Sequence, residues 1–171
     1  MKLIKQDGPY CIVYSLAMLL DVQPEEIFKY IGHRGDAILW AELNPPRCNQ
    51  GIHIQELLDF CMSKSHTMFP IQKHAMSSPY NDGSNAKCIW GPNKSKDRFK
   101  KYLCWFDGIL IMDIGSVGHA CAWDHIEQTV YDPRGYRKSI RDYLTIEFWP
   151  IVRFLKSYGI TYDFDSTNYQ G

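Results

Sequence analysis

A cysteine at the junction between a turn and an almost entirely apolar run is the feature that most constrains this chain. Gly8 and Pro9 break regular structure before Cys11, and residues 12–20 are apolar or aromatic except for Ser15. This pattern predicts a helix buried on nearly every side, with the cysteine in its first turn. Unpaired backbone N–H groups and the positive end of the helix dipole there favour a thiolate, the nucleophile of acyl-transfer chemistry. The plainer alternative is a buried structural cysteine.

Length and composition describe one folded domain. The 171 residues suffice for a hydrophobic core, and shares of 45% hydrophobic and 14% aromatic residues exclude a disordered chain. A formal net charge of zero gives no electrostatic reason to expect nucleic acid or an anionic membrane as a partner. No apolar run approaches the ~20 residues of a membrane span, and the N-terminus lacks a signal-peptide pattern. We therefore expect a cytoplasmic location, in the organism or in a host cell.

The cysteine pattern gives no indication of a metal site. The six cysteines form no CxxC pair, whereas structural zinc sites contain close-set ligand pairs. HExxH, P-loop and GxGxxG motifs are absent as well. We expect no metal, no cofactor, and a single domain over residues 1–171. A stretch rich in Ser, Asn, Gly, Pro and Lys predicts a loop insertion around 74–101.

Apolar periodicity predicts an α+β fold. A second helix is expected to start at 21–26 and to end at Gly32, and a third to begin after His53. Residues 33–50 are expected to form a loop. The remaining expected elements are strands at 67–72, 102–106 and 108–114, a hairpin of 118–124 and 128–135, and a final helix at about 147–158.

The predicted hairpin brings a histidine and an aspartate together. If its turn closes between Asp124 and Glu127, His119 lies directly opposite Asp132. Directly opposed residues of an antiparallel pair project to the same face, with Cβ atoms roughly 5 Å apart. A carboxylate hydrogen-bonded to an imidazole is the orienting half of a nucleophilic triad. The plainer alternative is a structural histidine beside an incidental Asp-Pro turn.

The order of these groups resembles a known enzyme family. Gln6 precedes the helix-opening Cys11, a glycine-preceded His119 follows far downstream on a strand, and Asp132-Pro133 ends the next strand. This pattern is similar to that of the papain-like cysteine peptidases, and most closely to their compact C39-like group. The resemblance implies a papain-like fold, with N-terminal helices packed on an antiparallel sheet and the active cleft between them.

The resemblance also implies a role for each residue. Cys11 is expected to attack a carbonyl carbon, and Gln6 to stabilise the oxyanion together with the backbone N–H of Cys11. His119 is expected to act as general base and then as general acid, oriented by Asp132. The implied reaction is hydrolysis of a peptide or isopeptide bond in a peptide or protein substrate.

Other functions remain open. The spacing of Gln6 and Cys11 is also similar to that of Josephin-type deubiquitinases, which would make a ubiquitin-like protein the substrate. The Gly-His-Ala and Tyr-Asp-Pro segments around His119 and Asp132 also resemble transglutaminase cores. Outside the enzymes, the alternative is a non-catalytic module that keeps the cleft to bind peptides. Reactivity of Cys11 separates this module from the enzymes.

Overall fold

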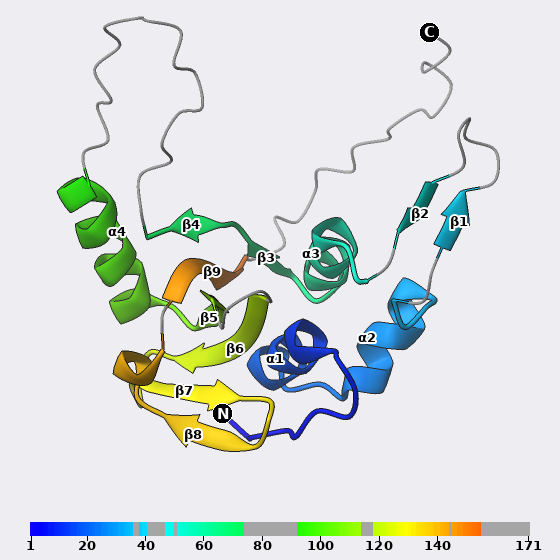
Figure 1. Cartoon of the computed structure of the whole chain (residues 1–171), viewed down its shortest axis with the longest axis horizontal. Coiled ribbons are helices and arrows are strands. Elements are labelled where there is room, and N and C mark those ends of the chain that lie inside the picture. The colour runs from blue at the N-terminus through cyan, green and yellow to red at the C-terminus, as the bar shows by residue number, and fades with distance from the viewer. Residues whose placement is uncertain are drawn as a thin grey trace, which may run out of the picture.

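One antiparallel sheet with helices on both faces forms the protein. In the computed structural model, α1, α2 and α3 pack on one face of the sheet and α4 on the other (Figure 1). The fold class is therefore α+β, as predicted. The structure describes residues 1–35, 38–40, 47–49, 51–73, 92–113, 118–143 and 145–154.

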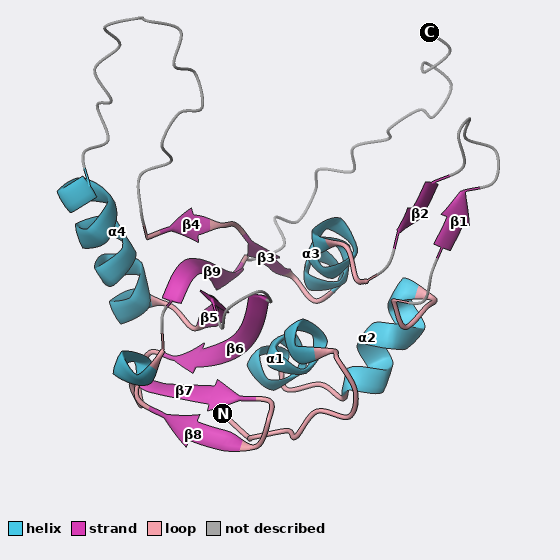
Figure 2. Cartoon of the chain, viewed as in Figure 1, coloured by secondary structure: helices cyan, strands magenta, loops and turns pink. Residues whose placement is uncertain are grey.

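The helices of the N-terminal half follow the predicted pattern (Figure 2). α1 begins at Cys11, which confirms the predicted place of this residue at the start of a buried helix, and α2 ends before Gly32, which has a φ of 87°. Among the described residues, no helix is long and apolar enough to cross a membrane. The α-helices are α1 (Cys11–Leu20), α2 (Pro24–Ile31), α3 (Ile54–Ser63) and α4 (Pro92–Trp105).

The main sheet has the strand order β3-β9-β5-β6-β7-β8, and β4 also pairs with β9. A separate pair, β1 with β2, lies within residues 33–50, which were expected to be loop. The strands are β1 (Ile38–Trp40), β2 (Arg47–Asn49), β3 (His66–Met68), β4 (Ile71–Gln72), β5 (Gly108–Asp113), β6 (Gly118–Asp124), β7 (Thr129–Asp132), β8 (Tyr136–Lys138) and β9 (Thr145–Arg153), with a 3-10 turn, η1 (Ile140–Asp142), before β9.

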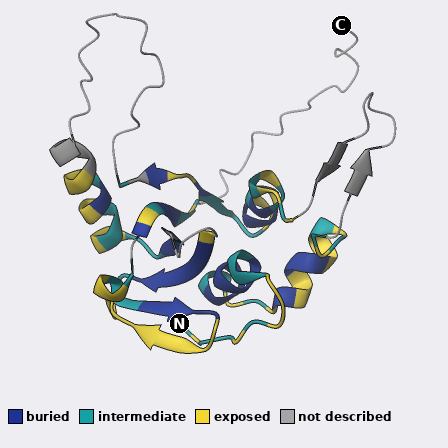
Figure 3. Ribbon diagram, in the orientation of Figure 1, coloured by how far each residue is buried: buried dark blue, intermediate teal, exposed yellow. Residues whose placement is uncertain are grey.

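Alternation along β5 divides the core into two layers. Ile109 and Ile111 pack with α1, α2 and α3, whereas Leu110 and Met112 pack with α4. Figure 3 shows that β6 and β7 are buried while β8, at the edge of the sheet, is exposed. The apolar residues that α4 and the residue after it contribute are Phe99, Tyr102, Leu103 and Phe106.

The predicted strand at 102–106 is wrong, because α4 extends to Trp105. The apolar residues of 99–106 recur at helical spacing, but a five-residue window is too short to distinguish this from a buried strand. The loop expected at 74–101 is wrong in part for the same reason, since residues 92–101 are helical. Residues 74–91 lie outside the described part of the chain.

The predicted final helix at 147–158 is also wrong, because Thr145–Arg153 form β9. The segment is rich in β-branched and aromatic residues, and it contains Pro150, which disfavours a helix. Ile151 donates its N–H toward β5, to the carbonyl of Asp107 at 2.9 Å. The nitrogen of the preceding residue, Pro150, therefore faces the opposite edge of β9. On that edge β4 pairs with residues 147–148 and β3 with residues 151–153, so position 150 lies between the two pairings and no N–H is needed there. Residues 155–158 lie outside the described part.

At Gly108 of β5, the neighbouring strand β9 comes so close that there is no room for a side chain. A Cβ atom there would lie 2.4 Å from the carbonyl oxygen of Trp149 and 2.6 Å from the Phe148 ring. We expect Gly108→Ala to lower the free energy of unfolding in urea by roughly 1–3 kcal/mol, as over-packing does. Gly118→Ala in β6 is the control, because a Cβ atom there meets nothing within 4 Å. Equal losses in the two variants would contradict the close approach of β9.

Candidate active site

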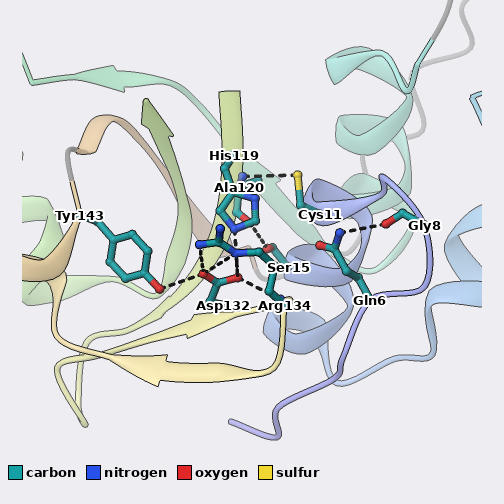
Figure 4. A network of polar contacts seen from close by, with 9 residues as sticks. All are labelled: Gln6, Gly8, Cys11, Ser15, His119, Ala120, Asp132, Arg134 and Tyr143. Carbon is teal, nitrogen blue, oxygen red and sulfur yellow. Dashed lines mark hydrogen bonds and ion pairs between the residues drawn. The ribbon is translucent and has the colours of Figure 1, made fainter. Parts of the chain in front are cut away.

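The thiol of Cys11 is held where α1 meets β6. The backbone N–H of Ala120 donates to Cys11 Sγ at 3.4 Å (Figure 4). One turn further along α1, the buried Ser15 hydroxyl donates to the carbonyl oxygen of Ala120 at 3.1 Å. Both polar groups of Ala120 are thus used to fix the N-terminal end of α1 against the strand. This contact brings Cys11 next to His119, the preceding residue of β6.

His119 and Asp132 meet as predicted, although through a different register. Nε2 of His119 lies 3.0 Å from Oδ1 of Asp132, and both residues are buried. Asp124 pairs with Thr129 instead of with Glu127, so the hairpin is displaced by two residues. Because side chains alternate with a period of two, this displacement leaves His119 and Asp132 on the same face as diagonal neighbours.

The carboxylate of Asp132 is surrounded by hydrogen-bond donors. Oδ1 accepts the backbone N–H of Arg134 at 2.9 Å, and Oδ2 accepts Nη2 of Arg134 at 2.6 Å and the hydroxyl of Tyr143 at 2.8 Å. Nε of Arg134 lies 3.1 Å from each oxygen. Burial by itself raises the pKa of a carboxyl, but the bonds from His119, Arg134 and Tyr143 hold the pKa of Asp132 well below its usual range. The ionised form of Asp132 is therefore the favoured partner of His119.

The charged forms of Cys11 and His119 stabilise each other. Burial opposes the thiolate, but hydrogen bonds from His119 and from the Ala120 N–H lower the pKa of Cys11 below its ordinary value. Burial also opposes the imidazolium, yet hydrogen bonds to Asp132 and Cys11 raise the pKa of His119. Because Nε2 is bound to Asp132, Nδ1 is the ring nitrogen left for the two cysteines that bond to His119, Cys11 and Cys121. By contrast, burial raises the pKa of Cys61 in α3 to about 12.

Gln6 lies beside these residues, but its amide nitrogen is bound locally. Nε2 donates to the carbonyl oxygen of Gly8 at 2.8 Å, and the buried Oε1 has no hydrogen-bond partner among the described residues. The backbone N–H of Gln6 donates to the carbonyl oxygen of Pro133 at 2.6 Å, which ties the N-terminal segment to the turn after Asp132. A role for Nε2 in an oxyanion hole stays a prediction, for which the second N–H of the amide group is available.

Three side chains that hold the site were not predicted: Ser15, Arg134 and Tyr143. Arg134 has a local signal, because it follows the buried Asp132 by two residues in the same turn. Ser15 was visible only as a polar interruption of an apolar run. Tyr143 has no local signal, since it reaches Asp132 only after the chain has passed through β8 and η1.

The side chains of His119, Cys121 and Asp132 could also hold a metal ion. Their ligand atoms all lie within 4.8 Å of one another, and nitrogen, sulfur and oxygen ligands suit zinc. However, both oxygens of Asp132 already accept hydrogen bonds from Arg134, whose positive charge would repel a cation. Burial also raises the pKa of Cys121 and so favours its neutral thiol. The arrangement suits a hydrogen-bonded acid–base pair better than a metal centre.

Comparisons with family models, curated proteins and solved structures give no match to this chain. The chemistry of the site therefore rests on its own geometry. Within the described residues, that geometry consists of a thiol at the start of a helix, an imidazole beside it and a buried carboxylate behind the imidazole.

Asp132→Asn is expected to lower the pKa of His119, because the imidazolium loses its charged acceptor. Loss of an adjacent opposite charge changes a pKa by about 1–3 units, and NMR titration of the His119 ring measures it. Asp142→Asn is the matched control, because Asp142 is an exposed acid in η1. An unchanged His119 pKa in Asp132→Asn would show that the carboxylate does not stabilise the imidazolium.

Proposed function

We propose that this protein is a cysteine peptidase that hydrolyses peptide or isopeptide bonds in a polypeptide substrate. The supporting observation is the arrangement of Cys11, His119 and Asp132, in which the pKa of the thiol is lowered and that of the imidazole is raised. A lowered thiol pKa and a raised imidazole pKa both favour a thiolate beside an imidazolium, which is the reactive form of a nucleophilic cysteine.

In the first half of the proposed reaction, Sγ of Cys11 attacks the substrate carbonyl carbon. A C–S bond forms, and the electron pair of the carbonyl π bond moves onto its oxygen. Backbone N–H groups in the first turn of α1 have no helical acceptor and can donate to this oxyanion. Nδ1 of His119 then protonates the leaving amine, the C–N bond breaks, and a thioester and a neutral imidazole remain.

In the second half, water hydrolyses the thioester. His119 takes a proton from the water through Nδ1 while the water oxygen attacks the thioester carbon. Collapse of the tetrahedral intermediate breaks the C–S bond and releases a carboxylic acid and the Cys11 thiolate. Asp132 keeps its charge throughout, because Arg134 and Tyr143 hold its carboxylate ionised.

Alkylation by iodoacetamide tests the thiolate–imidazolium pair directly. Since the pKa of Cys11 is lowered, its alkylation rate should rise with pH at a midpoint below the ~8.5 of a free thiol. His119→Ala should move the midpoint upward, because burial remains and the stabilising imidazolium is gone. Peptide mapping by mass spectrometry separates Cys11 from the exposed Cys104, which serves as the internal reference. The same midpoint in wild type and His119→Ala would contradict the pair.

Hydrolysis of a mixed peptide library and of a fluorogenic ubiquitin substrate tests the activity. We expect Cys11→Ala to lower the rate by at least about a thousandfold, as removal of a catalytic nucleophile does. Cleavage of the ubiquitin substrate alone would identify a deubiquitinase. Hydrolysis that survives in Cys11→Ala would contradict the assignment of the nucleophile.

A further inference from the structure

One face of the edge strand β8 lies directly beside Asp132. Tyr136 pairs with Asp132 and Lys138 pairs with Val130, and directly opposed residues project to the same face. Tyr136 is 52% exposed, and Lys138 and Arg134 are also exposed. We call Arg134, Tyr136 and Lys138 the β8 face.

Two contacts join the β8 face to the candidate active site. Arg134, whose side chain is 42% exposed, forms its ion pair with Asp132 at 2.6 Å. Nζ of Lys138 lies 5.2 Å from the ring centroid of Tyr136 and 5.8 Å from that of Tyr143, whose hydroxyl donates to Asp132. The exposed surface therefore begins one side chain away from the carboxylate that orients His119.

The opposite face of β8 carries Arg137. Arg137 lies over the Tyr131 ring at 4.6 Å, and the hydroxyl of Tyr131 donates to the carboxylate of Glu127 at 2.5 Å. On the β8 face, Lys138 has no ion pair with any described residue, and the carboxylate that pairs with Arg134 is fully buried. On the face that carries Tyr136, the ammonium group of Lys138 is therefore available to a partner, while the exposed guanidinium of Arg134 is already paired with Asp132.

Protection of a sheet edge explains only part of this composition. Lysine on an edge strand prevents unwanted strand pairing, and β8 has no neighbour on its outer side among the described strands. That role does not require a half-exposed tyrosine between two cations. Tyrosine and arginine are the residue types that contribute most to binding at protein interfaces, so the composition favours a recognition surface.

We propose that the β8 face docks an acidic segment of the polypeptide substrate, away from the bond that is cleaved. The proposal rests on the proposed peptidase function, because it names a feature of that substrate. Charge complementarity selects the occupant: carboxylates on alternate residues of an extended segment can reach Arg134 and Lys138. The Tyr136 ring between them supplies an apolar contact.

Fluorescence anisotropy of a labelled peptide of alternating Glu and Val tests this docking. The protein is the full chain with Cys11→Ala, which cannot cleave the probe, and the reference peptide has Gln in place of every Glu. We expect the Glu peptide to bind roughly tenfold more tightly, with a difference that shrinks at high salt. Equal affinities would overturn the proposal. Tighter binding of a single-stranded oligonucleotide than of the Glu peptide would also overturn it.

Two adjacent cations on opposite faces provide a matched pair of variants. Lys138→Gln should weaken binding of the Glu peptide roughly threefold and Tyr136→Ala roughly tenfold. Arg137→Gln removes the same charge one residue away and should change the affinity less than about 1.5-fold. Equal losses in Lys138→Gln and Arg137→Gln would overturn the assignment to this face. Thermal unfolding of each variant verifies that it is folded. If Tyr136→Ala does not fold, the comparison of Lys138→Gln with Arg137→Gln alone tests the proposal.

Failure of the docking proposal is distinguishable from failure of the peptidase proposal. Binding is measured without cleavage, whereas the nucleophile is tested by alkylation of Cys11. A reactive Cys11 with no preference for the Glu peptide would overturn the docking surface and keep the peptidase. Selective binding of the Glu peptide with an unreactive Cys11 would keep the surface and overturn the peptidase.

Discussion

Ionisation of the buried Asp132 carboxylate is the constraint on which the candidate site depends. A buried charge is costly unless it is paired and fully hydrogen-bonded, and Asp132 is completely inaccessible to solvent. Its donors come from β6 (His119), from the β7–β8 turn (Arg134) and from the segment after η1 (Tyr143). The same hydrogen bonds that stabilise the buried, ionised carboxylate therefore join three parts of the fold and orient the imidazole.

The contact between α1 and β6 has a comparable role on the other side of the imidazole. Ser15 and Cys11 lie one turn apart on α1, and both bond to the backbone of Ala120. Because the helix is bound to the strand at two points, the thiol has little freedom to move away from His119. Positions far apart in the sequence thus reach bonding distance through rigid elements, which is how precise sites are supported.

Charge balance explains how this group of ionised side chains can be buried together. In the charged forms that the pKa shifts of Cys11 and His119 favour, thiolate and imidazolium form one pair and carboxylate and guanidinium form another, so that the group as a whole is neutral. Arg134 is the member that reaches solvent, since its side chain is 42% exposed while its guanidinium binds Asp132. A residue of the buried network therefore also belongs to the exposed β8 face, and the interior of the site is physically continuous with the proposed docking surface.

The sequence alone determined the parts that depend on local pattern. A turn followed by an apolar run specified the cysteine-opened helix, and alternation specified that His119 and Asp132 share a face. That second inference survived a register displaced by two residues, because a period of two is unchanged by such a shift. Local pattern gave the wrong secondary structure for α4 and β9. In short windows their apolar residues fit both the helical and the strand period, and only packing in the folded protein distinguishes the two. Only the tertiary structure decided that Ser15, Arg134 and Tyr143 complete the site. The contacts of Ser15 and Tyr143 join elements that are far apart in the sequence, so the whole fold sets their approach. The contact of Arg134 depends on the turn after β7, whose position follows from the strand register.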